Sequence, residues 1–283
     1  MDFDNRRDEH RLELPWPEHW GEQRLWPPAA TLSISDETVI GGASSMTDAS
    51  FSDERRANSR ERAMFLEAAA MGKTRRLGEY LTSWNRLQII DQWRNEQGMN
   101  ALHLSALGGH LSCTRRLLLE LAPVDSEDYE KATPLMFAAL GGHIKVLDML
   151  IKNGALLGRP DADGRTALFY AVAGSQRPLV KHLLQKWRPD CTDFVRRMDN
   201  YGFTALYYAL NQYDLKMACL LVEHGARVDG HWLCEASLPL VERKTALMYA
   251  AECNDLESLG YFLHAGANPN AVRWTFMVPQ VRP

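Results

Sequence analysis

The sequence predicts an all-α solenoid of about six helix–turn–helix units, preceded by a disordered N-terminal tail. Three observations predict this architecture. A short phrase built around a leucine recurs five times, each copy is followed by a second leucine-rich segment, and the composition changes near residue 61. Self-similarity with a period of about 20–50 residues is typical of stacked units that bury their apolar faces against one another.

Residues 1–60 are expected to form the disordered tail. They are rich in Pro, Ser and Thr, carry 12 acidic residues against 7 arginines, and show no sustained helical or strand period. Such a composition buries too little apolar surface to fold. Trp16, Trp20 and Trp26 nevertheless lie in a Pro-rich part of this segment. Because tryptophan is usually buried somewhere, we expect them either to dock on a partner or to fold back over the first unit.

Each leucine phrase predicts the first helix of a unit. The leucines are separated by 33, 33, 38 and 41 residues, and a Thr or Asn that can cap the helix stands two positions before each one. Pro134 suits a first helical position, and Gly109 and Gly142 suit left-handed C-terminal positions. Tyr213 replaces this glycine in the fourth full unit, so we expect local irregularity there. The leucines and their capping residues are Leu102 with Asn100, Leu135 with Thr133, Leu168 with Thr166, Leu206 with Thr204, and Leu247 with Thr245.

A second helix is predicted after each phrase, because leucines follow at spacings of three and four. The two longer repeat steps place extra residues in loops near 187–198 and 228–243. Trp187, Phe194 and Trp232 lie in these loops. They either fold down to cover the stack or contact a ligand.

The phrase Gly-x-Thr-Pro-Leu-x-x-Ala-Ala-x-x-Gly-His, matched most fully by Ala132 to His143, resembles the ankyrin repeat. A diverged unit that contains Phe65 to Gly72 opens the array. Residues 273–283 are expected to form an apolar C-terminal cap, with a docking motif as the alternative. The resemblance implies units near residues 61–94, 95–127, 128–160, 161–198, 199–239 and 240–272.

The resemblance also implies where a partner binds. In ankyrin repeats the turns between units project as fingers beside the first helices and border a concave groove. Tyr129, Tyr201 and Phe203 are the candidate anchors, because aromatic residues often dominate interfaces. Packing of Tyr201 and Phe203 against the neighbouring insertion is the alternative. The positions that the resemblance assigns to partner binding are Glu96, Gln97, Met99, Tyr129, Glu130, Asp163, Arg165, Asn200, Tyr201, Phe203, Asn211 and Gln212.

Other classes of function are disfavoured by the sequence. The formal net charge is −4 and neither region is strongly basic, so a nucleic-acid partner is not expected. We find no apolar run long enough for membrane insertion. The stretch 72–74 lacks the upstream glycine of a phosphate-binding loop, and His231 with Cys234 is half of a zinc site without a second half. We therefore expect no catalytic residues, no cofactor and no metal.

The five cysteines show no paired spacing, which favours reduced thiols in the cytoplasm or nucleus. We expect a non-enzymatic protein–protein interaction module, monomeric by itself, that acts as a scaffold or adaptor through its concave groove and finger loops. An inhibitor or regulator that covers the active face of a partner enzyme is the alternative.

Overall fold

The structure, a computed structural model, describes residues 48–82, 86–186, 191–229 and 244–270. The chain divides into two compact units, Met1–Phe51 and Ser52–Pro283, and the repeats lie in the second. The described helices are α1 (Asp48–Ala70), α2 (Thr74–Leu81), α3 (Arg86–Gln92), α4 (Ala101–Leu107), α5 (Leu111–Leu119), α6 (Pro134–Leu140), α7 (Ile144–Lys152), α8 (Ala167–Ala173), α9 (Arg177–Lys186), α10 (Cys191–Arg196), α11 (Ala205–Asn211), α12 (Leu215–Glu223), α13 (Ala246–Glu252) and α14 (Leu256–His264).

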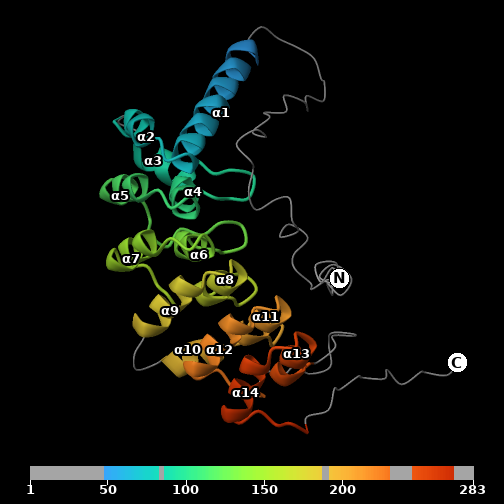
Figure 1. Ribbon diagram of the computed structural model, residues 1–283. Coiled ribbons are helices and arrows are strands. Elements are labelled where there is room, and N and C mark those ends of the chain that lie inside the picture. The colour runs from blue at the N-terminus through green and yellow to red at the C-terminus, as the bar shows by residue number, and fades with distance from the viewer. Residues whose placement is uncertain (1–47, 83–85, 187–190, 230–243, 271–283) are drawn as a thin grey trace, which may run out of the picture. The chain divides into compact units, whose positions relative to one another are not determined.

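The helices form pairs that follow one another in chain order (Figure 1). The first helices α4, α6, α8 and α11 contact their successive neighbours, and so do the second helices α2, α5 and α7. The last pair, α13 and α14, contacts α12. In the described ranges there is no strand, only an isolated antiparallel bridge between Met198 and Thr204. The predicted all-α array is therefore confirmed. None of the described helices is both long and apolar enough to span a membrane.

The repeated leucines form the core between units. Leu102, Leu135, Leu168 and Leu206 are all at most 1% exposed. Close approach of neighbouring first helices requires small residues beside them. At Gly174, for example, an added Cβ would lie 2.2 Å from the carbonyl oxygen of Leu140, which is closer than real atoms approach. The glycines and alanines of the repeated phrase thus permit backbone contact between units.

Side chains at the ends of the first helices also join successive units. The Nε2–H of His110 donates to the carbonyl of Ala70 at 2.8 Å, and that of His143 donates to Leu107 at 2.9 Å. In a later unit the side-chain amide of Gln212 donates to the carbonyl of Ala173 at 3.2 Å. Each of these bonds satisfies a helix C-terminal carbonyl that has no partner within its own helix.

The five predicted N-cap positions are correct, but not every predicted capping bond forms. Asn100 accepts hydrogen bonds from two first-turn amides, and Thr204 and Thr245 each accept one. The hydroxyls of Thr133 and Thr166 make no capping bond. In these two units the first-turn amides donate instead to the backbone carbonyl of the same threonine, which removes the need for the side chain.

The turn at Tyr213 is regular, in contrast to our expectation, because it makes the same hydrogen bond as the turns that contain glycine. Tyr213 adopts a φ of 57°, close to the 75° of Gly142. Its amide donates to Leu210 in the pattern that Gly142 makes with Ala139. The fourth full unit therefore keeps the regular turn, and the backbone strain is confined to one residue.

Two segments contain more helix than the sequence suggested. Helix α1 begins at Asp48 and so includes residues 48–60, which we had placed in the tail. Six of these 13 residues are Ala, Arg or Glu, which are good helix formers, and they lead directly into the alanine-rich end of α1. Helix α10 lies in the first enlarged loop, where Phe194 and Val195 are 6% and 1% exposed. Phe194 therefore covers the stack, one of the two alternatives.

Leu121 offers a test of strain in the turns. Its φ is 64° and its side chain is 75% exposed, so the side chain contributes little packing while the backbone is left-handed. Leu121→Gly should raise the free energy of unfolding by roughly 1 kcal/mol, because glycine adopts this conformation without steric clash. Urea unfolding would measure the change. The matched control is Leu119→Gly, at a residue that is 72% exposed but lies in α5, and it should destabilise. Equal effects of the two substitutions would contradict the interpretation.

Candidate protein-binding surface

Four turns between units share one geometry, and we call them fingers: residues 95–99, 128–132, 161–165 and 199–203. Each begins with Asp or Asn, whose side-chain oxygen accepts two backbone amides, two and four residues further on. For Asp161 these are the amides of Asp163 at 2.9 Å and Arg165 at 2.8 Å. The first amide of the finger also donates to the carbonyl four residues later, as Asp161 does to Arg165 at 2.9 Å. Asn95, Asp128 and Asp199 make the same bonds.

Backbone hydrogen bonds link the fingers into a row. The amide of Tyr129 donates to Gln97 at 3.1 Å, that of Ala162 to Glu130 at 2.8 Å, and that of Asn200 to Asp163 at 2.8 Å. In each case the second residue of one finger donates to the third residue of the preceding finger. The tips of the finger row are therefore fixed by main-chain bonds that do not depend on side-chain identity.

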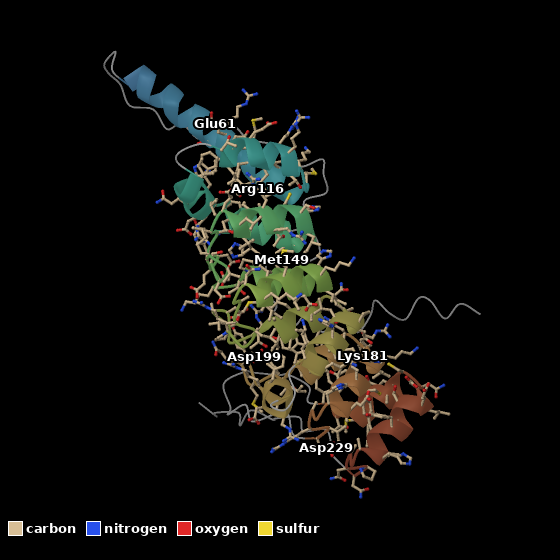
Figure 2. The ribbon with its side chains drawn as sticks, turned by 90° about the vertical axis from the view of Figure 1, so that its left-hand side faces the viewer. Glu61, Arg116, Met149, Lys181, Asp199 and Asp229 are labelled. Carbon is tan, nitrogen blue, oxygen red and sulfur yellow. The ribbon has the colours of Figure 1, made fainter. Side chains whose placement is uncertain are left out.

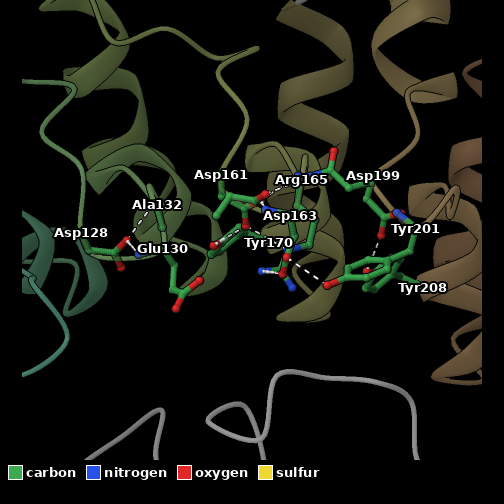
Figure 3. Close-up of polar contacts among 12 residues, drawn as sticks. Asp128, Glu130, Ala132, Asp161, Asp163, Arg165, Tyr170, Asp199, Tyr201 and Tyr208 are labelled. Atoms are coloured by element: carbon green, nitrogen blue, oxygen red, sulfur yellow. Dashed lines mark hydrogen bonds and ion pairs between the residues drawn. The ribbon is translucent and has the colours of Figure 1, made fainter.

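A buried ion-pair cluster supports the third finger (Figure 3). Arg165 is 5% exposed, and its guanidinium donates to Asp161 at 2.9 Å and to Asp163 at 2.7 Å. The hydroxyl of Tyr170 donates to Oδ2 of Asp161 at 2.9 Å, the same oxygen that Arg165 contacts. Burial alone disfavours the guanidinium charge, but the two carboxylates outweigh it and raise the pKa of Arg165. Burial and the Asp161 charge raise the pKa of Tyr170.

Tyrosines repeat this support in the next finger. The hydroxyl of Tyr208 donates to Asp199 at 2.7 Å, and that of Tyr201 donates across to Asp163 at 3.2 Å. The Asp–Tyr separation is nine residues in both pairs, Asp161 with Tyr170 and Asp199 with Tyr208. This nine-residue spacing is the sequence signal that identifies both tyrosines as supports of the fingers.

The second finger lacks this support, because Phe137 stands nine residues after Asp128 and carries no hydroxyl. Asp128 still accepts the amides of Glu130 at 2.9 Å and Ala132 at 2.8 Å. Burial nevertheless raises the pKa of Asp128 to about 6, and the nearby charges of Glu130 and Asp161 act in the same direction.

Three predicted partner-binding residues are buried, which contradicts their assignment to an exposed surface. Met99, Arg165 and Phe203 are 6%, 5% and 7% exposed. Each directly follows the finger glycine, whose left-handed conformation turns the chain under the finger. Phe203 stacks on Tyr207 with ring centroids 4.4 Å apart, so it packs inside its own unit instead of serving as an anchor.

The other predicted residues lie on the outside of the fingers or beside them. Glu96, Gln97, Glu130 and Asn200 are exposed, while Asp163, Asn211 and Gln212 are half-buried. The side-chain amide of Gln212 donates to the carbonyl of Ala173, as described above. The side-chain amide of Asn200 donates to the carbonyl of Ala162 at 2.9 Å. The labelled residues Asp199, in a finger, and Lys181, on the second helix α9, lie toward opposite edges of the array in Figure 2.

Tyr129 is the most exposed of the predicted aromatic anchors, at 70%, compared with 38% for Tyr201. An added Cβ at Gly98 would lie 2.6 Å from the Tyr129 ring and 2.7 Å from its amide nitrogen. The absence of a side chain at Gly98 therefore lets the Tyr129 backbone lie against the preceding finger. The near edge of the ring lies against Gly98, while the residue as a whole remains 70% exposed.

Several predicted residues lie outside the described ranges. They are Trp16, Trp20 and Trp26 of the tail, Trp187 and Trp232 of the enlarged loops, and His231 and Cys234.

Comparison with known families identifies the class of protein. A model of three consecutive ankyrin repeats matches residues 66–161 and 156–231, and a single ankyrin repeat matches residues 242–274. The chain therefore belongs to the ankyrin-repeat family, whose members are generally protein–protein interaction modules and typically not enzymes. No curated protein matches the sequence.

Phe137→Tyr should lower the pKa of Asp128, because the added hydroxyl would donate to it as Tyr170 and Tyr208 donate to their aspartates. In the natural protein, folding raises this pKa from 3.8 to about 6, so Asp128 contributes less to stability as pH rises through that window. Because the added hydroxyl stabilises the ionised carboxylate, Phe137→Tyr should have a higher free energy of unfolding than the natural protein. This difference should be larger at pH 7, where Asp128 is ionised, than at pH 4.

Carbon NMR titration of the Asp128 carboxyl would test this prediction directly, with urea unfolding at both pH values. The reciprocal control is Tyr208→Phe, which removes the equivalent hydroxyl and should raise the pKa of Asp199 further, beyond the rise that burial already causes. An unchanged Asp128 titration in Phe137→Tyr would refute the proposed role of the hydroxyl.

Proposed function

We propose that this protein is a non-catalytic scaffold or adaptor, and that it binds a segment of a partner protein along the finger row. The observation that carries the proposal is Tyr129. Tyr129 is 70% exposed, and its amide donates to the carbonyl of Gln97, so an accessible aromatic side chain extends from a fixed main chain. Preorganised aromatic side chains reduce the entropy lost on binding and are frequent energetic centres of interfaces.

The charge of the fingertips supports a cationic partner segment. Glu96 and Glu130 are exposed on neighbouring fingers, whereas Asp163 on the next finger is half-buried and already paired with Arg165. Lys131 is an exposed cation in the same row, and Arg165 is already paired with aspartates. Acidic groups therefore predominate at the tips, and complementary Lys or Arg side chains would set selectivity and speed association.

The finger geometry also sets a spacing for such a partner. One backbone hydrogen bond joins the two arms of each finger, and another joins the finger to the next one. Chain segments joined by such bonds lie about 4.8 Å apart. Two such steps place equivalent tips of neighbouring fingers about 10 Å apart. A polyproline II segment advances about 3.1 Å per residue and returns to the same face every third residue, at roughly 9 Å. An extended segment with cations at every third position fits this repeat.

The test is binding of a purified partner, isolated by affinity capture with the full chain, to matched single variants. Tyr129→Ala should weaken binding at least about tenfold with an unchanged melting temperature, because the side chain is largely exposed. Leu119→Ala is the matched control, since Leu119 is equally exposed at 72% but lies on the second helix α5. Affinity should also fall as salt concentration rises. Full affinity in Tyr129→Ala together with a loss in Leu119→Ala would place the binding surface on the second helices and contradict the proposal.

A further inference from the structure

The second helices of three consecutive units carry an excess of positive charge, although the formal net charge of the chain is −4. Helices α5, α7 and α9 contain one acidic residue between them. Helix α12 instead pairs one Lys with one Glu, and α14 has one Glu and neither Lys nor Arg. The exposed cations that we call the basic face are Arg115 and Arg116 of α5, Lys145 and Lys152 of α7, and Lys181 and Lys186 of α9.

The one acidic residue of these helices is already neutralised. Asp148 of α7 lies 2.8 Å from Nε2 of His182 and forms an ion pair with Lys186, so these contacts also join α7 to α9. Most of the cations, in contrast, have no ion-pair partner among the residues that the structure describes. These unpaired cations are Arg115, Lys145, Lys152 and Lys181.

Three exposed leucines lie among these cations, at the C-terminal ends of α5 and α7. Leu119, Leu121 and Leu156 are 72%, 75% and 58% exposed. Leu119 lies one helical turn after Arg115 and therefore on the same face of α5. The amide of Leu156 donates to the side chain of Asp125 at 3.2 Å, which holds this leucine against the unit that contains the other two.

Leu121 occupies a turn that favours glycine. Its φ is 64°, and its amide donates to the carbonyl three residues earlier, as the amides of Gly154, Gly225 and Gly266 do in other units. A left-handed leucine costs roughly 1 kcal/mol, and a side chain that is 75% exposed recovers little of this through packing. The leucine thus weakens the turn, and such local strain fits a role in contact with something outside the array.

The combination of exposed leucine and lysine matches an anionic bilayer better than a protein or a nucleic acid. In protein interfaces Lys is depleted, and Leu is under-represented among the residues that dominate the binding energy. Single-stranded nucleic acids are held largely by aromatic stacking, whereas the apolar residues here are leucines. At a membrane surface, anionic headgroups attract each Lys or Arg, and leucine side chains enter the boundary between headgroups and acyl chains.

We propose that the basic face binds the surface of an anionic phospholipid bilayer. Leu119, Leu121 and Leu156 insert between the headgroups, and the cations of α5, α7 and α9 contact the lipid phosphates. This contact does not depend on the finger row, because Lys181 of the basic face and the finger residue Asp199 lie toward opposite edges of the array (Figure 2).

Co-sedimentation of the full chain with lipid vesicles tests the proposal. Vesicles of phosphatidylcholine with about 30% phosphatidylserine should bind the chain, and less so as salt concentration rises, whereas pure phosphatidylcholine vesicles should not. Arg115→Gln with Lys152→Gln should lower the partition coefficient about fivefold for each cation removed. Leu121→Asn with Leu156→Asn should lower it at least about fivefold, because asparagine tolerates the left-handed turn but offers no apolar surface.

Matched controls change the same residue types outside the basic face. Lys216→Gln on α12 and Leu256→Asn on α14, where Leu256 is 76% exposed, should bind vesicles like the natural chain. Tyr129→Ala should also bind them normally, which separates this test from that of the finger row. The melting temperature of each variant should not fall, because every substituted side chain is exposed.

Three outcomes would overturn the proposal. The first is equal binding to the neutral and the anionic vesicles, or to neither. The second is unchanged vesicle binding in the two double variants. The third is equally tight binding of polyglutamate or polyuridylate that is lost in the cation variant and unchanged in the leucine variant, which would assign the basic face to a soluble polyanion.

Discussion

Burial of each helix pair by its neighbours is the constraint on which the rest of the structure depends. A single pair is two short helices, and its apolar residues face both the preceding and the following unit. In the internal units the repeated leucine is at most 1% exposed, whereas Leu247 in the last described pair is half-buried. The small residues beside the leucines, including Gly174 at its close contact with Leu140, follow from the same need for close approach.

The fingers solve a second problem that stacking creates. A turn that projects from the helices exposes backbone amides and carbonyls, which must find partners. The side chain of the leading Asp or Asn accepts two of these amides, and an amide of the next finger donates to one of the carbonyls. The same bonds therefore hold all four fingers in the row. Arg165, Tyr170 and Tyr208 add side-chain support from below. The side chains above the row are then free to differ, and this is where the exposed Tyr129 lies.

The sequence predicts the array well because stacking leaves a repeated signature in leucine, glycine and capping positions. Sequence reasoning fails where one position serves two roles. Met99, Arg165 and Phe203 occupy family positions associated with binding, yet each turns under its finger and is buried. Tyr170 and Tyr208 are not singled out by the repeated phrase, although their nine-residue spacing from Asp161 and Asp199 indicates the hydrogen bonds that they make to the fingers. Helix α10 was missed because six residues in an insertion are too few to show a helical period.

Stacking as the source of stability is tested most directly by the hydrogen-exchange rates of backbone amides along the described helices under native conditions. If neighbours on both sides stabilise each pair, the amides of α6 and α8 should exchange most slowly, and exchange should become faster toward α2 and toward α14. Uniform exchange across all pairs, or central helices that open as readily as terminal ones, would contradict this account.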